Sequence, residues 1–418
     1  MKKTAVFLMF LLFFLVFVCI SGKIPVEFYD SGFLGDRAFA EDDAEPVRIP
    51  AGTILWKFET WGEVYSSPVV VDGVVYFGSA DTLFYAVDAV TGAEIWHVDT
   101  GGPINNFSTV ADGVVYFSSE NYVYAVNAKD GSLKWRFEIA CTPVRIETPW
   151  ESLVEDSSEM GELEPPGASS PAVSDGVVYF GMWNNLYGSG YICDKFLYAV
   201  NASDGTELWR FQTDGLFITS APAVNNGIVY FGTDYGDLYA VRSRDGSVIW
   251  KSPEGEGFTT IPFYADGTLY VGWEGAVVYA LDSLTGSEQW MYRTGLGVYL
   301  CAAFSLAPTS NPVVVDGRVY FGGSDGDFKD CLYALDARSG KEVWRFNTGG
   351  RSPFSSSPRI QDGIVYVGSD DHCLYAVDAE TGEERWRFET EGPVESSPAV
   401  ENGIVYFGSN DTYLYAVE

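Results

Sequence analysis

The sequence predicts an all-β protein, an eight-bladed β-propeller with four antiparallel strands in each blade. Three features recur eight times in step along the 418 residues: a Tyr-Ala-Val or Tyr-Ala-Leu motif, a tryptophan, and an Asp-Gly or Asn-Gly turn. Most repeats are about 40 residues apart, which is the length of one propeller blade. The motif tyrosines are Tyr85, Tyr124, Tyr198, Tyr239, Tyr279, Tyr333, Tyr375 and Tyr415. The turn glycines are Gly73, Gly113, Gly176, Gly227, Gly267, Gly317, Gly363 and Gly403.

Each unit divides into four short strands, as residues 67–98 illustrate. Residues 68–71 and 74–78 flank Asp72-Gly73, a two-residue turn whose backbone needs positive φ at both positions. Residues 83–88 and 93–96 form the third and fourth strands, which are joined across Thr91-Gly92. These runs are nearly continuously apolar. That pattern indicates burial on both faces, as in blades packed face to face around an axis.

The two ends of the repeat region predict how the ring closes. The last unit stops at Val417-Glu418 after its third strand, while an orphan fourth strand, about residues 54–59, precedes the first unit. This N-terminal strand is predicted to complete the last blade, because closed β architectures leave no free sheet edge. The propeller domain is therefore expected to span residues 51–418.

The N-terminal region has the features of an export signal. Lys2 and Lys3 precede an apolar run that ends before Ser21, so residues 1–22 are predicted to be a signal peptide or an N-terminal membrane anchor. Cys19 also allows lipidation, although Val18 replaces the small residue that normally precedes a lipidated cysteine. Residues 23–50 have the mixed composition of a linker. The folded domain is expected to be extracellular or in the cell envelope.

The chain is strongly acidic, with 25 Lys and Arg against 58 Asp and Glu and a formal net charge of −33. Such a surface repels phosphate backbones, so nucleic acid is not expected as a partner. Contact with a membrane is expected only through the N-terminal segment. We expect a monomer that this charge keeps in solution.

Two units carry insertions. Residues 141–168 and 182–195 expand the third unit, and residues 295–310 and 324–330 expand the sixth. In an up-down-up-down blade, the connection into the first strand and the connection between the second and third strands lie on the same face. All four insertions are therefore expected to project from one face. Loops on a rigid scaffold are where function usually resides.

The cysteines fit this arrangement. Cys141 and Cys193 lie in the two insertions of the third unit, and Cys301 and Cys331 lie in, or at the end of, those of the sixth. Four cysteines permit three pairings, and the one that keeps each bridge local is Cys141–Cys193 with Cys301–Cys331. Cys373 is left over and is expected to be a small buried core residue.

No motif for catalysis or metal binding stands out. The two histidines, His97 and His372, are far apart in sequence, which leaves few members for a metal site or a hydrolytic triad. Acidic turns such as residues 324–327 resemble fragments of calcium loops but lack the spaced ligands, so hairpin turns explain them better. We therefore expect no catalytic residue and no metal site.

The repeat resembles the pyrroloquinoline quinone (PQQ)-like repeat family. Its clearest copies are Val377-Asp-Ala-Glu-Thr-Gly-Glu-Glu-Arg-Trp386-Arg-Phe and Ser396-Ser-Pro-Ala-Val400, and the resemblance covers about residues 52–418. It implies the propeller fold and a structural role for the repeat tryptophan, which docks on a glycine between neighbouring blades. Matching residues are Trp96 with Gly92 and Trp386 with Gly382. The implied docking tryptophans are Trp56, Trp96, Trp135, Trp209, Trp250, Trp290, Trp344 and Trp386.

The family that this repeat resembles has two broad branches. Quinoprotein dehydrogenases hold PQQ and calcium in the funnel, commonly against a disulfide between adjacent cysteines, whereas the outer-membrane barrel-assembly lipoprotein is not an enzyme. This chain has no adjacent cysteine pair, so we favour an exported non-catalytic scaffold without a cofactor. We expect it to bind a protein or cell-surface partner through the face carrying the insertions, with Trp150, Trp183 and Tyr191 as candidate anchors.

Two alternatives remain open. The first is a PQQ- and calcium-dependent dehydrogenase of alcohols or sugars, in which carboxylates and amides would ligate calcium, tryptophan would stack on the cofactor and arginine would pair with its carboxylates. Its candidate cofactor-binding residues are Arg145, Glu147, Trp183, Asn184, Asn185, Asp325, Asp327 and Arg351. The second alternative is a carbohydrate-binding or adhesive surface module.

Overall fold

The structure is a computed structural model in which Ile49–Glu418 form one compact unit. It describes residues 51–143, 167–183, 191–193, 195–214, 217–218, 220–233, 237–252, 260–273, 277–295, 310–325, 329–349 and 352–418. The regular secondary structure in these ranges is entirely β-strand. Within them, no helix has the length and apolar character needed to cross a membrane.

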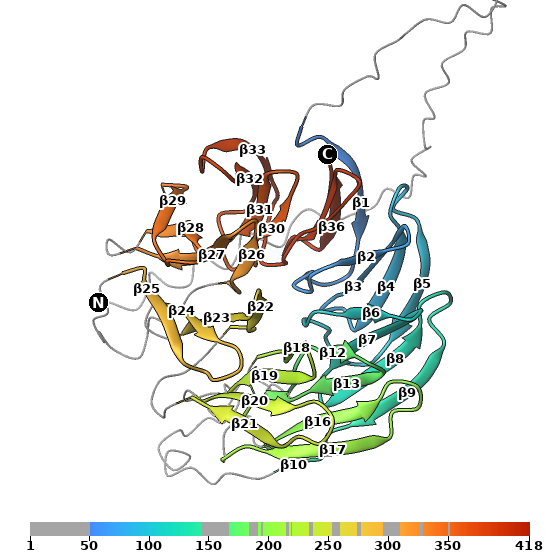
Figure 1. The fold of residues 1–418 in the computed structure, drawn as a ribbon. Coiled ribbons are helices and arrows are strands. Elements are labelled where there is room, and N and C mark those ends of the chain that lie inside the picture. Colours follow the sequence, from blue (N-terminus) through green and yellow to red (C-terminus); the bar gives the residue numbers. More distant parts are fainter. Residues whose placement is uncertain are drawn as a thin grey trace, which may run out of the picture. The chain divides into compact units, whose positions relative to one another are not determined.

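Eight four-stranded antiparallel sheets form a ring, which confirms the predicted eight-bladed propeller (Figure 1). We number the blades 1 to 8 along the chain. Blade 1 contains β2 (Val69–Val71), β3 (Val74–Gly78), β4 (Leu83–Asp88) and β5 (Glu94–Asp99). Blade 2 contains β6 (Thr109–Ala111), β7 (Val114–Ser119), β8 (Tyr122–Asn127) and β9 (Leu133–Glu138). Blade 3 contains β12 (Ala172–Ser174), β13 (Val177–Phe180), β16 (Phe196–Asn201) and β17 (Glu207–Gln212). Blade 4 contains β18 (Ala223–Asn225), β19 (Ile228–Gly232), β20 (Leu238–Arg242) and β21 (Val248–Lys251).

The remaining four blades repeat this order. Blade 5 contains β22 (Phe263–Ala265), β23 (Thr268–Trp273), β24 (Val277–Asp282) and β25 (Glu288–Arg293). Blade 6 contains β26 (Val313–Val315), β27 (Arg318–Ser324), β28 (Asp330–Asp336) and β29 (Glu342–Asn347). Blade 7 contains β30 (Arg359–Gln361), β31 (Ile364–Ser369), β32 (Cys373–Asp378) and β33 (Glu384–Glu389). Blade 8 contains β34 (Ala399–Glu401), β35 (Ile404–Gly408), β36 (Tyr413–Val417) and β1 (Ile54–Glu59).

The turn between the first and second strands of each blade has the backbone that its sequence predicts. In blade 1, Asp72 has φ 52° and Gly73 has φ 76°, and Val71 faces Val74 across the turn. Positive φ at both central residues gives a hairpin turn whose twist matches that of the flanking strands. The same pair of positive φ values recurs in all eight blades, so the dipeptide sets the start of every blade.

Blade 8 closes the ring as predicted. β1 pairs antiparallel with β36, and its register places Trp56 opposite Ala416 and Glu59 opposite Tyr413. The N–H of Gly52 donates to the carbonyl of Glu418, and the N–H of Glu418 donates to Thr53 at 3.0 Å. The fourth strand of the last blade therefore comes from the beginning of the described chain, and blade 8 has no missing edge.

The core consists of side chains packed between neighbouring blades. In the cluster between blades 1 and 2, Phe84 stacks on Phe117 with ring centroids 4.0 Å apart. Side chains on both faces of the second and third strands are buried, which explains why these strands are continuously apolar in sequence. Neighbouring first strands also contact one another around most of the ring, so they line its axis.

Each repeat tryptophan docks on a glycine of the next blade. A Cβ at Gly92 would lie 2.6 Å from Trp56 of blade 8, and one at Gly131 in blade 2 would lie 2.8 Å from Trp96. Trp96 therefore docks on Gly131 and not on Gly92, which belongs to its own blade. Likewise, Gly382 receives Trp344, whereas Trp386 lies against Gly52. The contact joins consecutive blades because each sheet presents its fourth strand to the neighbouring sheet.

Candidate functional site

The connections that carry the insertions lie on one face of the ring. Because the strands of each blade alternate in direction, the connection between the second and third strands lies on the same side as the connection into the first strand. Residues 141–168, 182–195, 295–310 and 324–330 all occupy such connections. We call this side the insertion face, and we call the side carrying the other two turns of each blade the turn face.

The two insertions of blade 3 pair with each other. β10 (Cys141–Pro143) pairs with β15 (Tyr191–Cys193), and β11 (Gly167–Ala168) pairs with β14 (Met182–Trp183). Segments from both connections of the same blade thus form two short antiparallel ribbons beside the four-stranded sheet. This pairing gives the insertion face a built element of its own.

Two of the three predicted partner anchors have their backbone in these ribbons. The backbone of Trp183 lies in β14 opposite Gly167, and that of Tyr191 lies in β15 opposite Pro143. Trp150 lies outside the described residues. Their role in binding stays a prediction.

Of the predicted cofactor-binding residues, the structure describes the side chain of Asp325 alone. Its Oδ1 accepts a hydrogen bond from the N–H of Lys329 at 3.0 Å, and its N–H donates to the carbonyl of Lys329 at 2.8 Å. Asp325 therefore caps the connection between β27 and β28. Trp183 has its backbone in β14, and the others lie outside the described residues: Arg145, Glu147, Asn184, Asn185, Asp327 and Arg351.

The cysteines of the two expanded blades behave differently. Cys141 and Cys193 are register partners in the β10–β15 ribbon, an arrangement that fits the predicted bridge, which itself stays a prediction. Cys331 is a free thiol, contrary to the prediction of a Cys301–Cys331 bridge. It lies in β28, not in the inserted loop, and its buried side chain packs in the core between blades 5 and 6, where Asn347 Nδ2 lies 3.3 Å from its Sγ. Cys301 lies outside the described residues.

Cys373 is also a free and buried thiol, as predicted. Burial and the nearby Asp371 carboxylate raise the pKa of the Cys373 thiol to about 11. Burial likewise raises the pKa of the Cys331 thiol. Both thiols therefore remain protonated at neutral pH, so they are structural and not reactive cysteines.

A cavity of about 200 Å³ lies where the first strands begin, at the insertion-face end of the ring axis. Proline, aliphatic and aromatic side chains make up most of its wall, and the polar members are Asn311, Ser357, Arg359 and Ser397. Arg359 supplies the wall's one charge, and its guanidinium has no ion-pair partner among the described residues.

A belt of hydrogen bonds holds the rim of this cavity. The N–H of Ile261 donates to Asn311 Oδ1 at 2.7 Å, and the N–H of Asn311 donates to Ser357 Oγ at 3.2 Å. From there, the N–H of Ser357 donates to Ser397 Oγ at 2.8 Å, and the N–H of Ser397 donates to Ser67 Oγ at 2.7 Å. The belt runs unbroken from blade 5 to blade 1, so these hydroxyl and amide groups are used in holding blades together.

Two carboxyl groups next to this region are partly withdrawn from water. Asp330 begins β28, and Asp370 lies between β31 and β32. Burial raises the pKa of both carboxyl groups, and neighbouring carboxylates contribute. Ser324 Oγ donates to Asp330, whereas Asp370 Oδ1 is buried without a hydrogen-bond partner among the described residues.

The described residues of this face do not fit a quinone and calcium site. Calcium takes about six to eight oxygen ligands, several of them carboxylates, and the cavity wall holds no carboxylate. Within the described ranges, no group of three or more His, Cys, Asp or Glu side chains could hold a metal ion. The volume of this cavity, about 200 Å³, is also below the roughly 300–1,000 Å³ of typical cofactor sites.

One exposed residue of the insertion face was missed from the sequence. Trp61 lies in the connection from β1 to β2 and is 92% exposed, and its N–H donates to Asp81 Oδ2 at 3.0 Å. The sequence feature that could have identified Trp61 is its position in the repeat. The corresponding connections carry Gly101 and Glu391 where this one carries tryptophan. A large exposed aromatic side chain on a fixed backbone is a suitable anchor for a protein partner.

Comparisons with known proteins find both an assembly factor and an enzyme among the relatives. Tetrathionate hydrolase of Acidithiobacillus ferrooxidans is 26% identical over 263 residues, which are 59% of this chain and 50% of that protein. Outer membrane protein assembly factor BamB of Yersinia pestis is 26% identical over 251 residues, which are 59% of this chain and 43% of that protein. The matched part thus spans half or less of the length of these relatives.

A solved structure shows the same fold. Quinohemoprotein alcohol dehydrogenase ADHIIG from Pseudomonas putida HK5 aligns with a TM-score of 0.66 and 14% identity, over 89% of this chain and 78% of that one. The family model described as outer membrane protein assembly factor BamB matches residues 43–181, 194–328 and 329–418, nearly the whole propeller. The chain therefore belongs to this family of PQQ-like repeat propellers.

Proposed function

We propose that this chain is an exported, non-catalytic propeller scaffold of the cell envelope that binds a protein partner through its insertion face. The observation that carries the proposal is the placement of all four insertions in connections of one side, with two of them paired into ribbons. Enlarged connections on a rigid ring are suited to recognition, because the scaffold fixes the loops that make contact.

The chemistry of the described residues supports binding over catalysis. The hydroxyls at the mouth of the axis are engaged in the inter-blade belt. The two buried thiols are protonated. Trp61 by contrast offers a large apolar surface to a partner. The family's description as an outer membrane assembly factor agrees with a protein partner in the envelope.

Site-directed photo-crosslinking in the native envelope tests the face. A photoreactive residue at Trp61 or at the exposed Lys329 is on the insertion face, whereas Val90 and Leu284, 73% and 66% exposed, are matched positions on the turn face. We expect one and the same partner to be crosslinked from the first two positions and not from the other two. Equal crosslinking from both faces would contradict the proposal.

Substitution then measures the contribution of individual anchors. Trp61→Ala is expected to weaken binding of the crosslinked partner by about tenfold or more, as for a central aromatic anchor. Leu284→Ala serves as the control on the turn face, and circular dichroism checks that both variants keep the ring. Trp150, Trp183 and Tyr191 are tested by the same alanine substitution.

The two alternatives have separate readouts. A quinoprotein dehydrogenase must take up PQQ in the presence of calcium, which equilibrium dialysis detects without any assumption about the substrate. A carbohydrate-binding module must retain glycans on an array. Either result, together with failure of crosslinking from Trp61 and Lys329, would replace the scaffold proposal.

A further inference from the structure

Blade 7 places a charged residue at the first position of its first strand, where the other seven blades place uncharged ones. The eight residues at this position are Val69, Thr109, Ala172, Ala223, Phe263, Val313, Arg359 and Ala399. Because the first strands line the axis of the ring, Arg359 brings a guanidinium to this axis. Arg359 is exposed, and its guanidinium has no ion-pair or hydrogen-bond partner among the described residues.

Arg359 belongs to the wall of the cavity of about 200 Å³ at the insertion-face end of the axis. Phe107 of blade 2 lines this cavity together with residues 261–263, 311–313, 357–359 and 397–398 of blades 5 to 8. Blades 2 and 6 lie on opposite sides of the ring, so residues from both can line one cavity only across the axis. We call this cavity the axial socket.

The other polar side chains in the wall of the axial socket are already bonded to one another or to the backbone. Ser357 Oγ accepts hydrogen bonds from Nδ2 of Asn311 at 2.8 Å and from the N–H of Asn311 at 3.2 Å. Ser397 Oγ accepts one from the N–H of Ser357 at 2.8 Å. The wall also contains four prolines, which have no N–H to offer: Pro262, Pro312, Pro358 and Pro398. Arg359 is therefore the polar side chain of the wall that stays available to a ligand.

A carboxylate is the group that fits Arg359 in these surroundings. A guanidinium pairs with a carboxylate through two parallel hydrogen bonds, and an apolar wall strengthens such a pair relative to water. The wall of the axial socket contains no carboxylate that would compete for Arg359. Its volume is below the roughly 300–1,000 Å³ of sites for drug-sized ligands, so it suits a single side chain. Aspartate and glutamate combine a carboxylate with a short aliphatic stem.

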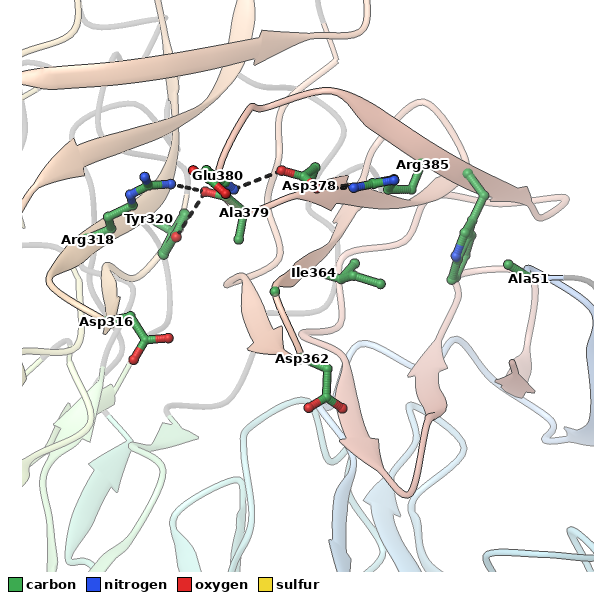
Figure 2. A pocket seen from close by; sticks show the side chains of 12 residues that line it. Ala51, Asp316, Arg318, Tyr320, Asp362, Ile364, Asp378, Ala379, Glu380 and Arg385 are labelled. Atoms are coloured by element: carbon green, nitrogen blue, oxygen red, sulfur yellow. Dashed lines mark hydrogen bonds and ion pairs between the residues drawn. The ribbon is translucent and has the colours of Figure 1, made fainter.

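The larger cavity of about 770 Å³ on the turn face offers no comparable group (Figure 2). Both of its arginines are already bonded, because Arg385 pairs with Asp378 and Arg318 donates to the carbonyl of Ala379. The other charged residues of its wall are the carboxylates Asp316, Asp362 and Glu380. An acidic group would be repelled there, so the available guanidinium distinguishes the axial socket from the larger cavity.

We propose that the axial socket receives an acidic side chain of the protein partner, an aspartate or glutamate whose carboxylate pairs with Arg359. This inference rests on the proposed function, because the axial socket lies at the insertion-face end of the axis. The chain has a net charge of −33, so most of its surface repels an acidic group. A carboxylate accepted at the axis and disfavoured elsewhere fixes how the partner is oriented on the insertion face.

Substitution in the full chain tests the pairing with the partner that is crosslinked from position 61. Arg359→Met should weaken binding of this partner by about tenfold or more, and the ring should tolerate it because other blades carry apolar residues there. Arg338→Met removes the same charge from an exposed position on the turn face and should change binding by about twofold or less. Equal binding by Arg359→Met and the unsubstituted chain would overturn the inference while leaving the proposed function intact, whereas failure of crosslinking from Trp61 and Lys329 counts against the proposed function itself.

A titration with sodium butyrate tests the axial socket without the partner. Butyrate carries a carboxylate on a short aliphatic chain, butyramide is its neutral counterpart, and sodium chloride at equal concentration controls for ionic strength. The NMR signal of the Arg359 Nε–H, assigned by its loss in Arg359→Met, should shift to saturation with butyrate and stay in place with butyramide. The signal of Arg338 should not saturate. A shift of Arg359 that is absent, or no different from that of Arg338, would overturn the inference.

Discussion

The indole ring of Trp344 in blade 6 lies so close to Gly382 in blade 7 that a Cβ on this glycine would be 2.7 Å from Trp344 Cδ2. Gly382 also has φ 75°, a region that side chains rarely adopt. Glycine is therefore required at this position for two reasons: the backbone has a positive φ, and the Trp344 indole leaves no space for a Cβ atom.

Gly382→Ala is expected to lower the free energy of unfolding by about 2–4 kcal/mol, because it combines backbone strain with displacement of the indole. Gly363→Ala is the matched control: it has φ 76°, and nothing lies within 4 Å of its added Cβ. That variant should lose only about 1–2 kcal/mol from its backbone. Urea unfolding of both variants measures the difference, and equal losses would argue against a role for the packing.

The thiols of Cys331 and Cys373 are expected to resist alkylation in the native protein. Both are buried, and burial raises the pKa of each thiol, that of Cys373 to about 11. Only unfolding should expose them to the reagent. Peptide mapping after iodoacetamide treatment, with and without denaturant, checks this, and rapid native labelling of either residue would contradict it.

A peptide map prepared without reduction tests the predicted Cys141–Cys193 bridge in the β10–β15 ribbon. Because Cys141 and Cys193 are register partners, a peptide linked through these two residues is expected from protein secreted into an oxidising compartment. Alkylation of both cysteines without reduction would rule the bridge out.

Asp370→Asn is expected to stabilise the protein at pH 7 and to have less effect at pH 4. Burial raises the pKa of the Asp370 carboxyl above its unfolded value. The protonated form thus favours folding below the unfolded pKa of about 3.9, and that stability is lost as the pH rises through the folded pKa. Melting temperatures at the two pH values check the sign. Asp362→Asn, in an exposed turn where blades 4 and 8 carry asparagine, is the control for the effect of the amide substitution itself.

Lys251→Met is expected to lower the free energy of unfolding by about 1–3 kcal/mol, the cost of leaving a charged group without its partner. Lys251 Nζ lies 2.9 Å from Asp237 Oδ2, and the Asp237 side chain is only 6% exposed. Adding Asp237→Asn should recover part of the loss, because the unpaired charge is removed. A double variant less stable than Lys251→Met would contradict this account.

Much of the fold could be predicted because its signals are local. Asp72-Gly73 and its seven equivalents set the turns, and the strand at residues 54–59, which has no unit of its own before the first repeat, indicated the closing segment. The docking partner could not be read in the same way. Each unit carries both a tryptophan and a turn glycine, such as Trp96 and Gly92, and only the packing shows that Trp96 contacts Gly131 of the next blade.

The candidate site was less predictable because it depends on where side chains point. Cys331 adjoins an inserted loop in sequence, yet it occupies a strand position equivalent to that of Cys373, two residues before the repeat tyrosine. Aligning the two cysteines would have indicated a core residue. The exposure of Trp61 depends on how the β1–β2 connection is held against Asp81, and no local pattern encodes that contact.

The pairing of β1 with β36 has a consequence for the order of assembly. A ribosome makes Ile54–Glu59 before any blade and makes Tyr413–Val417 after all the others. No nascent chain can therefore seal itself, and each incomplete product keeps open edges at both ends of its row of sheets. Sealing thus requires that β36 has been made, and chains truncated before β36 should be open to quality-control proteases.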